Sequence, residues 1–286
     1  MRQTSVSLHR MRSMLQAFCV LALLMPMLGG CEGSSEQKKL RHYQKGMEYM
    51  KKDEVQAAIL EFKNAIDIDP AYADAYFQLG FAYNKIDEFD KAMIAFDSAA
   101  ANDPKNVDAR LEVANYYYLR QQDMTKAQQV LEKILQDFPE NAKTHAALGS
   151  VLYAQQQVDE AAAALEKSLE LDGALVSAGI TLGQMYVLQN QPEKAQQVLE
   201  RVLQKQPDNL DILVATAAFY LEHKRVEDAK RLYEHAVSLN AQNAEAVMGL
   251  AEASLAQNAP DMTLKILEQF QATMKDKITA EVSLRI

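Results

Sequence analysis

One pattern of large, small and helix-breaking residues returns about every 34 residues from Lys39 onward. It is clearest over residues 73–106, where large side chains stand at positions 4, 11 and 24, small ones at positions 8 and 20, and a proline at position 32. These six residues are Tyr76, Gly80, Tyr83, Ala92, Phe96 and Pro104. A period of this length is typical of a repeated supersecondary unit, so the pattern constrains the fold of most of the chain.

The spacing within one unit predicts a hairpin of two helices. Positions 4, 7 and 11 lie on one face of a helix, because apolar residues three and four apart share a face. Small residues at positions 8 and 20 allow the two helices to approach closely. The proline at position 32 ends the second helix, since it lacks an N–H and clashes with the preceding turn. A single hairpin cannot bury its apolar face alone, so neighbouring hairpins are expected to stack into a continuous core.

The register extends to seven units, of which the last is degenerate. One additional residue near Gln121–Asp123 shifts the second half of the third unit. Gly173 replaces the proline of the fourth unit and Gly179 stands where the fifth needs a bulky side chain, which predicts a looser joint between these two units. Residues 278–286 are expected to form a partial capping helix or the start of a truncated repeat. The seven units are residues 39–72, 73–106, 107–141, 142–175, 176–209, 210–243 and 244–277.

These signature positions resemble those of the tetratricopeptide repeat (TPR), and the resemblance covers residues 39 to 275. It implies an all-α fold, a right-handed α-solenoid of TPR helix-turn-helix hairpins. It also implies a chain that binds protein or peptide partners.

The first thirty residues differ from the rest and are expected to be a removable export signal. Residues 1–16 contain three arginines and no acid, and residues 17–28 are an apolar run broken only by Pro26. That run is shorter than the roughly 20 residues that a membrane-spanning helix needs. A basic start, a short apolar centre and small residues after it are typical of a secretory signal.

Cys31 follows this segment and is the lipidation site that the sequence suggests. Leu28-Gly29-Gly30-Cys31 resembles the lipobox of bacterial lipoproteins, which implies acyl chains on the cysteine. Two acyl chains give stable attachment to a bilayer. Residues 31–38 are expected to be the lipidated N-terminus and a short linker, and Glu32 favours the periplasmic face of the outer membrane.

No catalytic or cofactor-binding motif is found, so we expect no enzyme activity, no cofactor and no metal site. The sequence contains no glycine-rich phosphate loop, no zinc-protease histidine pair and no G-x-S-x-G elbow. A formal net charge of -9 argues against a nucleic-acid partner, which would be held by neutralising phosphates.

The resemblance implies that the concave face carries the binding site, at positions 2, 5, 9 and 12 of the first helix of each unit. Aromatic, methionine and amide side chains there would suit a groove for an apolar peptide or helix. For Phe77 and Phe81, packing within the array is an equally good interpretation. The groove residues are Tyr43, Met47, Phe77, Phe81, Asn84, Leu111, Asn115, Tyr118, Ser150, Tyr153 and Gln184.

Anchor and array together resemble TPR lipoproteins of Gram-negative envelopes. This implies a membrane-anchored scaffold that assists assembly of a type IV pilus, a secretion system or an exopolysaccharide export machine. Two alternatives remain: the chain is the regulatory TPR portion of a larger enzyme, or it binds peptidoglycan or another glycan, with Tyr118 and Tyr153 as stacking platforms.

Overall fold

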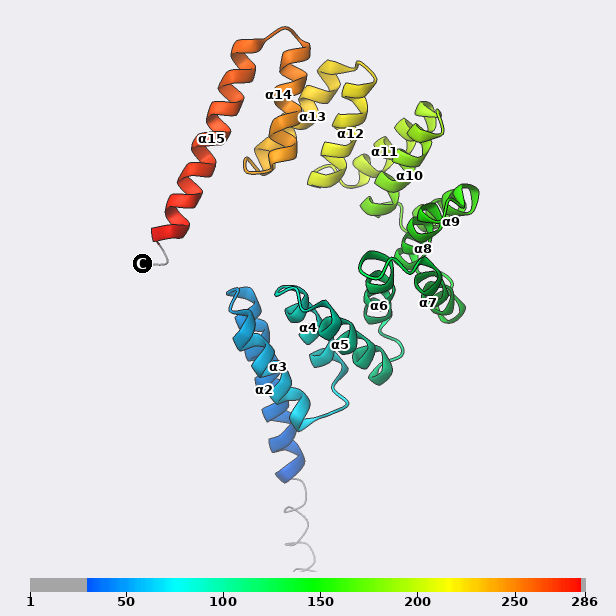
Figure 1. Ribbon diagram of the computed structural model, residues 1–286, viewed down its shortest axis with the longest axis vertical. Coiled ribbons are helices and arrows are strands. Elements are labelled where there is room, and N and C mark those ends of the chain that lie inside the picture. Colours follow the sequence, from blue (N-terminus) through cyan, green and yellow to red (C-terminus); the bar gives the residue numbers. More distant parts are fainter. Residues whose placement is uncertain (1–29, 284–286) are drawn as a thin grey trace, which may run out of the picture. The chain divides into compact units, whose positions relative to one another are not determined.

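The computed structural model describes the backbone of residues 30–283 and the side chains of residues 35–275. The expected signal segment up to residue 29, the side chain of Cys31 and residues 284–286 therefore lie outside the described residues. The described part contains fourteen helices and no strand, which confirms the all-α prediction (Figure 1). The chain divides into two compact units, Met1–Tyr116 and Tyr117–Ile286.

In the first compact unit, helices α2 to α5 form two hairpins. Helix α2 packs on α3, and α4 packs on α5. Helix α3 also contacts α4, so the two hairpins are stacked. The helices are α2 (Gly30–Lys51), α3 (Val55–Ile68), α4 (Ala73–Asn84), α5 (Phe89–Asn102) and α6 (Val107–Leu119), the last of which ends in the second unit.

The second compact unit continues the same arrangement. Consecutive helices contact one another from α7 to α15, and the first helices of successive hairpins, α8, α10, α12 and α14, contact one another as well. The helices are α7 (Met124–Asp137), α8 (Ala142–Ala154), α9 (Val158–Leu171), α10 (Val176–Leu188), α11 (Pro192–Lys205), α12 (Leu210–Glu222), α13 (Val226–Leu239), α14 (Ala244–Ala256) and α15 (Pro260–Ser283).

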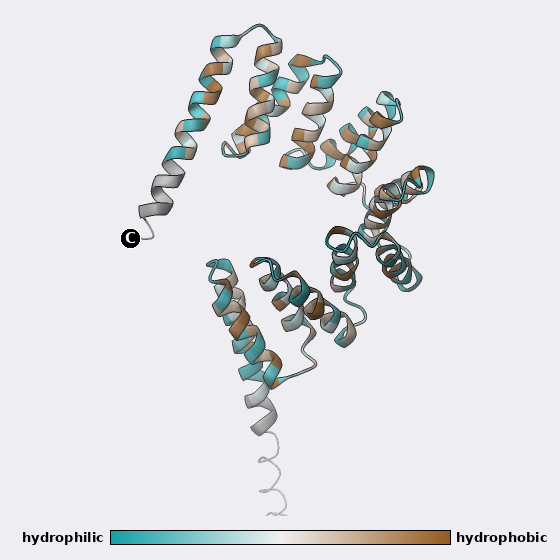
Figure 2. Cartoon of the chain, in the orientation of Figure 1, coloured by the Kyte–Doolittle hydropathy of each residue, from teal (hydrophilic) through white to brown (hydrophobic). Residues whose placement is uncertain are grey.

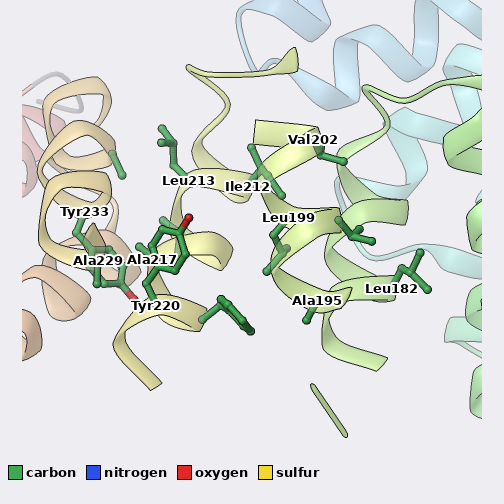
Figure 3. Close-up of a cluster of buried hydrophobic side chains, with 14 of the residues drawn as sticks. Leu182, Ala195, Leu199, Val202, Ile212, Leu213, Ala217, Tyr220, Ala229 and Tyr233 are labelled. Atoms are coloured by element: carbon green, nitrogen blue, oxygen red, sulfur yellow. The ribbon is translucent and has the colours of Figure 1, made fainter. Parts of the chain in front are cut away.

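The core of the second unit runs continuously from hairpin to hairpin. Leu199 and Val202 of α11 lie between Leu182 of α10 and Ile212 of α12, and all four side chains are buried (Figure 3). The helices interleave hydrophobic and hydrophilic residues, whereas the turns between them are largely hydrophilic (Figure 2). Stacking therefore buries the apolar face that a single hairpin would leave exposed.

Each hairpin turn contains one residue in the left-handed region, and none of these residues is glycine. Their φ angles lie between 52° and 66°. Successive members are 34 residues apart, except that the additional residue of the third unit makes one interval 35. They are Asp53, Asp87, Gln122, Gln156, Asn190, Lys224 and Asn258.

The turn between units does not depend on proline. Asp69 precedes Pro70 and accepts a hydrogen bond from the backbone N–H of Ala71, two residues on. Asp172 makes the same turn before Gly173, through the N–H of Ala174. A carboxylate that accepts a hydrogen bond from the N–H two residues ahead stabilises a turn by itself, so the fourth unit, without a proline, ends as the first does.

The structure differs from three expectations. Residues 31–38 lie in α2 instead of a linker, and an ion pair between Glu36 and Lys39 stabilises this part of the helix. Residues 278–283 continue α15 and form no separate helix. Gly179 leaves no empty space: a Cβ there would lie 2.7 Å from Cγ2 of Val202, so the packing basis for a looser joint is absent.

Candidate protein-binding groove

A groove of about 560 Å³ opens on the face formed by α10, α12 and α14. These three are first helices of successive hairpins, and α12 contacts both α10 and α14 directly. The groove lies wholly within the second compact unit. Half of its lining comes from positions 2, 5, 9 and 12 of the first helices, the positions expected on the concave face.

The floor of the groove is apolar and part of it is open to solvent. Val214 and Phe219 of α12 are buried beneath it, whereas Ala218 is exposed. Leu188, at the end of α10, has 74% of its surface exposed. Other large apolar side chains of the described residues are exposed as well, and Leu188 differs in lying beside further apolar residues that line a groove. The remaining apolar side chains of the lining are Ile180, Val187, Leu199 and Ala215.

The polar residues of the groove are predominantly acidic. Asp211 lies in the first turn of α12, Glu245 in the first turn of α14, and Glu222 is the last residue of α12. All three side chains are exposed. No lysine, arginine or histidine lines the groove. The surface therefore presents carboxylates around an apolar floor.

Packing behind the floor keeps the groove helices in place. Gly183 of α10 allows Leu199 of α11 to approach closely, since a Cβ on Gly183 would lie 3.0 Å from Cδ2 of Leu199. The side chain of Asn209 accepts hydrogen bonds from the N–H groups of Asp211 and Ile212 and so caps the start of α12. The ring of Phe219 stacks on His223, with centroids 4.2 Å apart.

A second interaction ties adjacent hairpins together away from the groove. The hydroxyl of Tyr220 donates to Oε1 of Glu200 in the preceding hairpin at 2.5 Å, and Arg225 lies over the tyrosine ring, 4.1 Å from its centroid. The hydroxyl of Tyr186 donates to Glu166 in the same way. Burial, and then the hydrogen bond to the carboxylate, raises the pKa of each tyrosine to about 12.

In the first compact unit, the predicted aromatic groove residues take part in packing. The rings of Phe77 and Phe81 meet edge to face with centroids 4.9 Å apart, and both rings also contact the buried ring of Phe96. The ring of Tyr43 packs against Phe62 and Tyr72. These rings are half-buried, so much of their surface is committed to the hairpins themselves.

The predicted groove residues of α6, and Asn84 of α4, are also at least half-buried by neighbouring side chains. Leu111 is only 7% exposed, so most of its side chain packs into the core. The amide of Asn115 hydrogen-bonds the half-buried carboxylate of Glu112, whose pKa is raised by burial. Met47, Asn84 and Tyr118 are half-buried.

The structure brings one predicted residue into the large groove: Gln184 lines it and is exposed. Tyr153 lines an adjoining hollow of about 380 Å³ together with Met185 and Leu188. The hydroxyl of Ser150 is occupied by a hydrogen bond to the carbonyl of Ala146 in its own helix.

Most of the groove lies outside the predicted residues, because these residues come from the first five units only. The same positions in units 210–243 and 244–277 include Asp211, Val214, Ala218 and Glu245, all of which line the groove. Phe219 and Glu222 lie outside those positions, so their part in the groove is visible only in three dimensions.

Two other features of the described residues bear on function. No group of three or more His, Cys, Asp or Glu side chains there is arranged to hold a metal ion. No helix in that part of the chain combines the length and the apolar character needed to cross a membrane.

Three families of helical repeats match the chain. The family described as the cytochrome c-type biogenesis protein H TPR domain matches residues 119–247, which include all the residues that line the groove. Two tetratricopeptide-repeat families match residues 46–87 and 73–106. No curated protein sequence matches this chain.

The chain is similar in fold to several solved structures. PilW, a type IV pilus biogenesis factor, is 19% identical, with 75% of this chain and 99% of that one covered and a TM-score of 0.60. PilF of Pseudomonas aeruginosa is 17% identical, with 87% and 99% covered and a TM-score of 0.50. A tetratricopeptide-repeat protein from Parabacteroides merdae is 17% identical, with 82% and 93% covered and a TM-score of 0.58.

Proposed function

We propose that this chain, whose hairpins match tetratricopeptide-repeat families, is a non-catalytic scaffold that binds protein partners through the groove on α10, α12 and α14. The observation that carries the proposal is the groove itself. It combines an apolar floor, including the highly exposed Leu188, with a few polar groups at its edges. Surfaces of this kind recognise an extended peptide or an amphipathic helix.

We further propose that the scaffold works at a bacterial membrane, anchored through acyl chains on Cys31. The support is the N-terminal sequence, with its basic start, short apolar run and Leu28-Gly29-Gly30-Cys31. Because residues 31–38 are helical, they span only about 11 Å at 1.5 Å per residue. An anchored array would therefore lie close to the bilayer surface.

Two kinds of envelope machine fit such a scaffold. The first is an assembly machine, namely a type IV pilus, a secretion system or an exopolysaccharide exporter. This proposal is supported by the resemblance of the anchor sequence and the repeat array to envelope lipoproteins. Cytochrome c biogenesis is the second, because the family match over residues 119–247 is to a domain described by that process. Partner identity decides between them.

The groove is tested by filling it. Ala218 is exposed on the floor, so Ala218→Trp should obstruct the groove without disturbing the core. Ala163 is exposed on the second helix α9 outside the groove, and Ala163→Trp is the matched control. We expect proteins that co-purify with the wild-type chain and the control to be lost with Ala218→Trp. An unchanged set of partners would contradict the proposed site.

The anchor is tested separately by Cys31→Ser. We expect this variant to leave the membrane fraction and to lose metabolically incorporated fatty acid, while helical content by circular dichroism stays unchanged. Membrane association that survives the substitution would show that attachment does not depend on lipid at Cys31.

A further inference from the structure

We propose that the occupant of the groove is a cationic protein segment, with an apolar centre and a lysine or arginine towards each end. This inference rests on the proposed function and specifies the partner's chemistry. It follows from three properties of the groove: the sign of its charges, their lack of partners, and their placement around the apolar floor.

The charges of the groove have one sign. Asp211, Glu222 and Glu245 line it, and no basic side chain does. Elsewhere in the described residues carboxylates commonly pair with cations, as Asp228 does with Arg225 and Arg231. The three groove carboxylates have no ion pair with any residue whose side chain the structure describes. A ligand with the opposite charge can therefore bind them without displacing an existing partner.

The placement of the carboxylates sets the spacing of the ligand's charges. Asp211 and Glu222 lie near opposite ends of α12, eleven residues apart, which corresponds to about 16 Å along the helix axis. Val214, Ala215 and Ala218 lie between them on the same helix. An acidic group thus stands near each end of an apolar strip, and Glu245 adds a second acid at the end where α14 begins.

Apolar contact and charge then have separate roles. The floor would bury the apolar centre of the ligand, and that burial supplies most of the affinity. The exposed carboxylates would steer the approach, exclude acidic segments and fix the position of the basic ends. Because these carboxylates are exposed, their contribution should weaken as salt is added.

The test measures binding of two labelled peptides to the full chain in uncharged detergent. Both peptides carry the same leucine-rich amphipathic centre, one with lysines and the other with glutamates at the two ends. We expect the lysine-ended peptide to bind about tenfold more tightly at low salt, with the difference shrinking at high salt.

Two triple variants distinguish the effect of the groove carboxylates on peptide binding from the effect of the net charge of the chain. Asp211→Asn, Glu222→Gln and Glu245→Gln together should weaken binding of the lysine-ended peptide about fivefold or more. Glu160→Gln, Glu193→Gln and Glu268→Gln remove three exposed carboxylates outside the groove and should change it less than about twofold. Circular dichroism verifies that both variants are folded.

The possible outcomes distinguish this inference from the proposed function. If both peptides bind equally, or the groove triple variant binds as the wild type does, while Ala218→Trp blocks binding, the groove is a docking site but the cationic ligand is wrong. If Ala218→Trp leaves peptide binding intact, both the inference and the proposed groove fail. Failure of the lysine-ended peptide to bind, or self-association of the chain through the groove, also overturns the inference.

Discussion

Gly80 of α4 lies directly against the ring of Phe96 of α5, so closely that a Cβ on Gly80 would be 2.5 Å from Cε1 of Phe96. The same relationship joins Gly46 to Phe62 and Gly149 to Leu165. In each hairpin the glycine is at position 8 and the large residue is at position 24. The glycine of the first helix thus makes room for a large, almost completely buried side chain of the second.

We expect Gly80→Ala to destabilise the protein, although alanine is the better helix former by about 1 kcal/mol. The new methyl group must displace Phe96, and overpacking a well-packed core costs about 1–3 kcal/mol. Denaturant unfolding measures the change. The third hairpin has Ala114 and Leu131 at the corresponding positions, so adding Phe96→Leu should restore part of the loss. A Gly80→Ala variant more stable than the wild type would contradict this packing.

Much of this packing could be predicted from the sequence, because residue size at positions 8 and 24 repeats seven times along the chain. The left-handed turn residues could not, since Lys224 or Gln122 has no composition signal for a positive φ. The groove was predicted only in part. Burial of Leu111 depends on how neighbouring helices pack, and a rule about one helix face does not contain that information.

The left-handed turn at Lys224 offers a stabilising substitution. Its φ is 61°, a conformation that costs a side-chain-bearing residue about 1–2 kcal/mol. Glycine avoids that strain but loses more entropy on folding, so Lys224→Gly should raise the free energy of unfolding by about 0.5–1 kcal/mol. Ala163→Gly, in the interior of α9, should instead lower it by about 1 kcal/mol. A destabilised Lys224→Gly variant would argue against the left-handed turn.

The tyrosine–glutamate pairs between hairpins predict a loss of stability at alkaline pH. The pKa of Tyr186 is raised from an ordinary value of 10.0 to about 12, chiefly by burial and then by its hydrogen bond to Glu166. Between these two values the unfolded chain releases the proton and the folded chain keeps it. The contribution of this pair to the stability of the folded chain is therefore fully present below pH 10 and falls as the pH rises towards 12.

Tyr186→Phe removes the ionisable hydroxyl, so this variant should lose less stability than the wild type over the same pH interval. Glu166→Gln should make Tyr186 ionise at a lower pH, which the absorbance of tyrosinate measures directly. If Tyr186→Phe and the wild type lose stability equally between pH 10 and 12, the hydrogen-bonded pair has no part in the alkaline transition.

The cap of α12 links local structure to the groove. Asn209 accepts hydrogen bonds from the N–H groups of Asp211 and Ile212, so Asn209→Ala should destabilise the protein by about 1 kcal/mol. Asn209→Asp retains an oxygen acceptor and should be close to the wild type. Thermal unfolding of the wild type and the two variants measures the change in stability. Equal melting temperatures for Asn209→Ala and the wild type would exclude a capping role.

The most direct test of the account is site-specific photocrosslinking in living cells. A photoreactive amino acid replaces Ala218 on the groove floor or, as the control, Ala163 on α9. We predict that light joins one discrete protein partner to the chain from position 218 and none from position 163, and that the crosslinked segment contains apolar residues flanked by lysine or arginine. Adducts of equal yield from both positions, or none from position 218, would contradict binding through the groove.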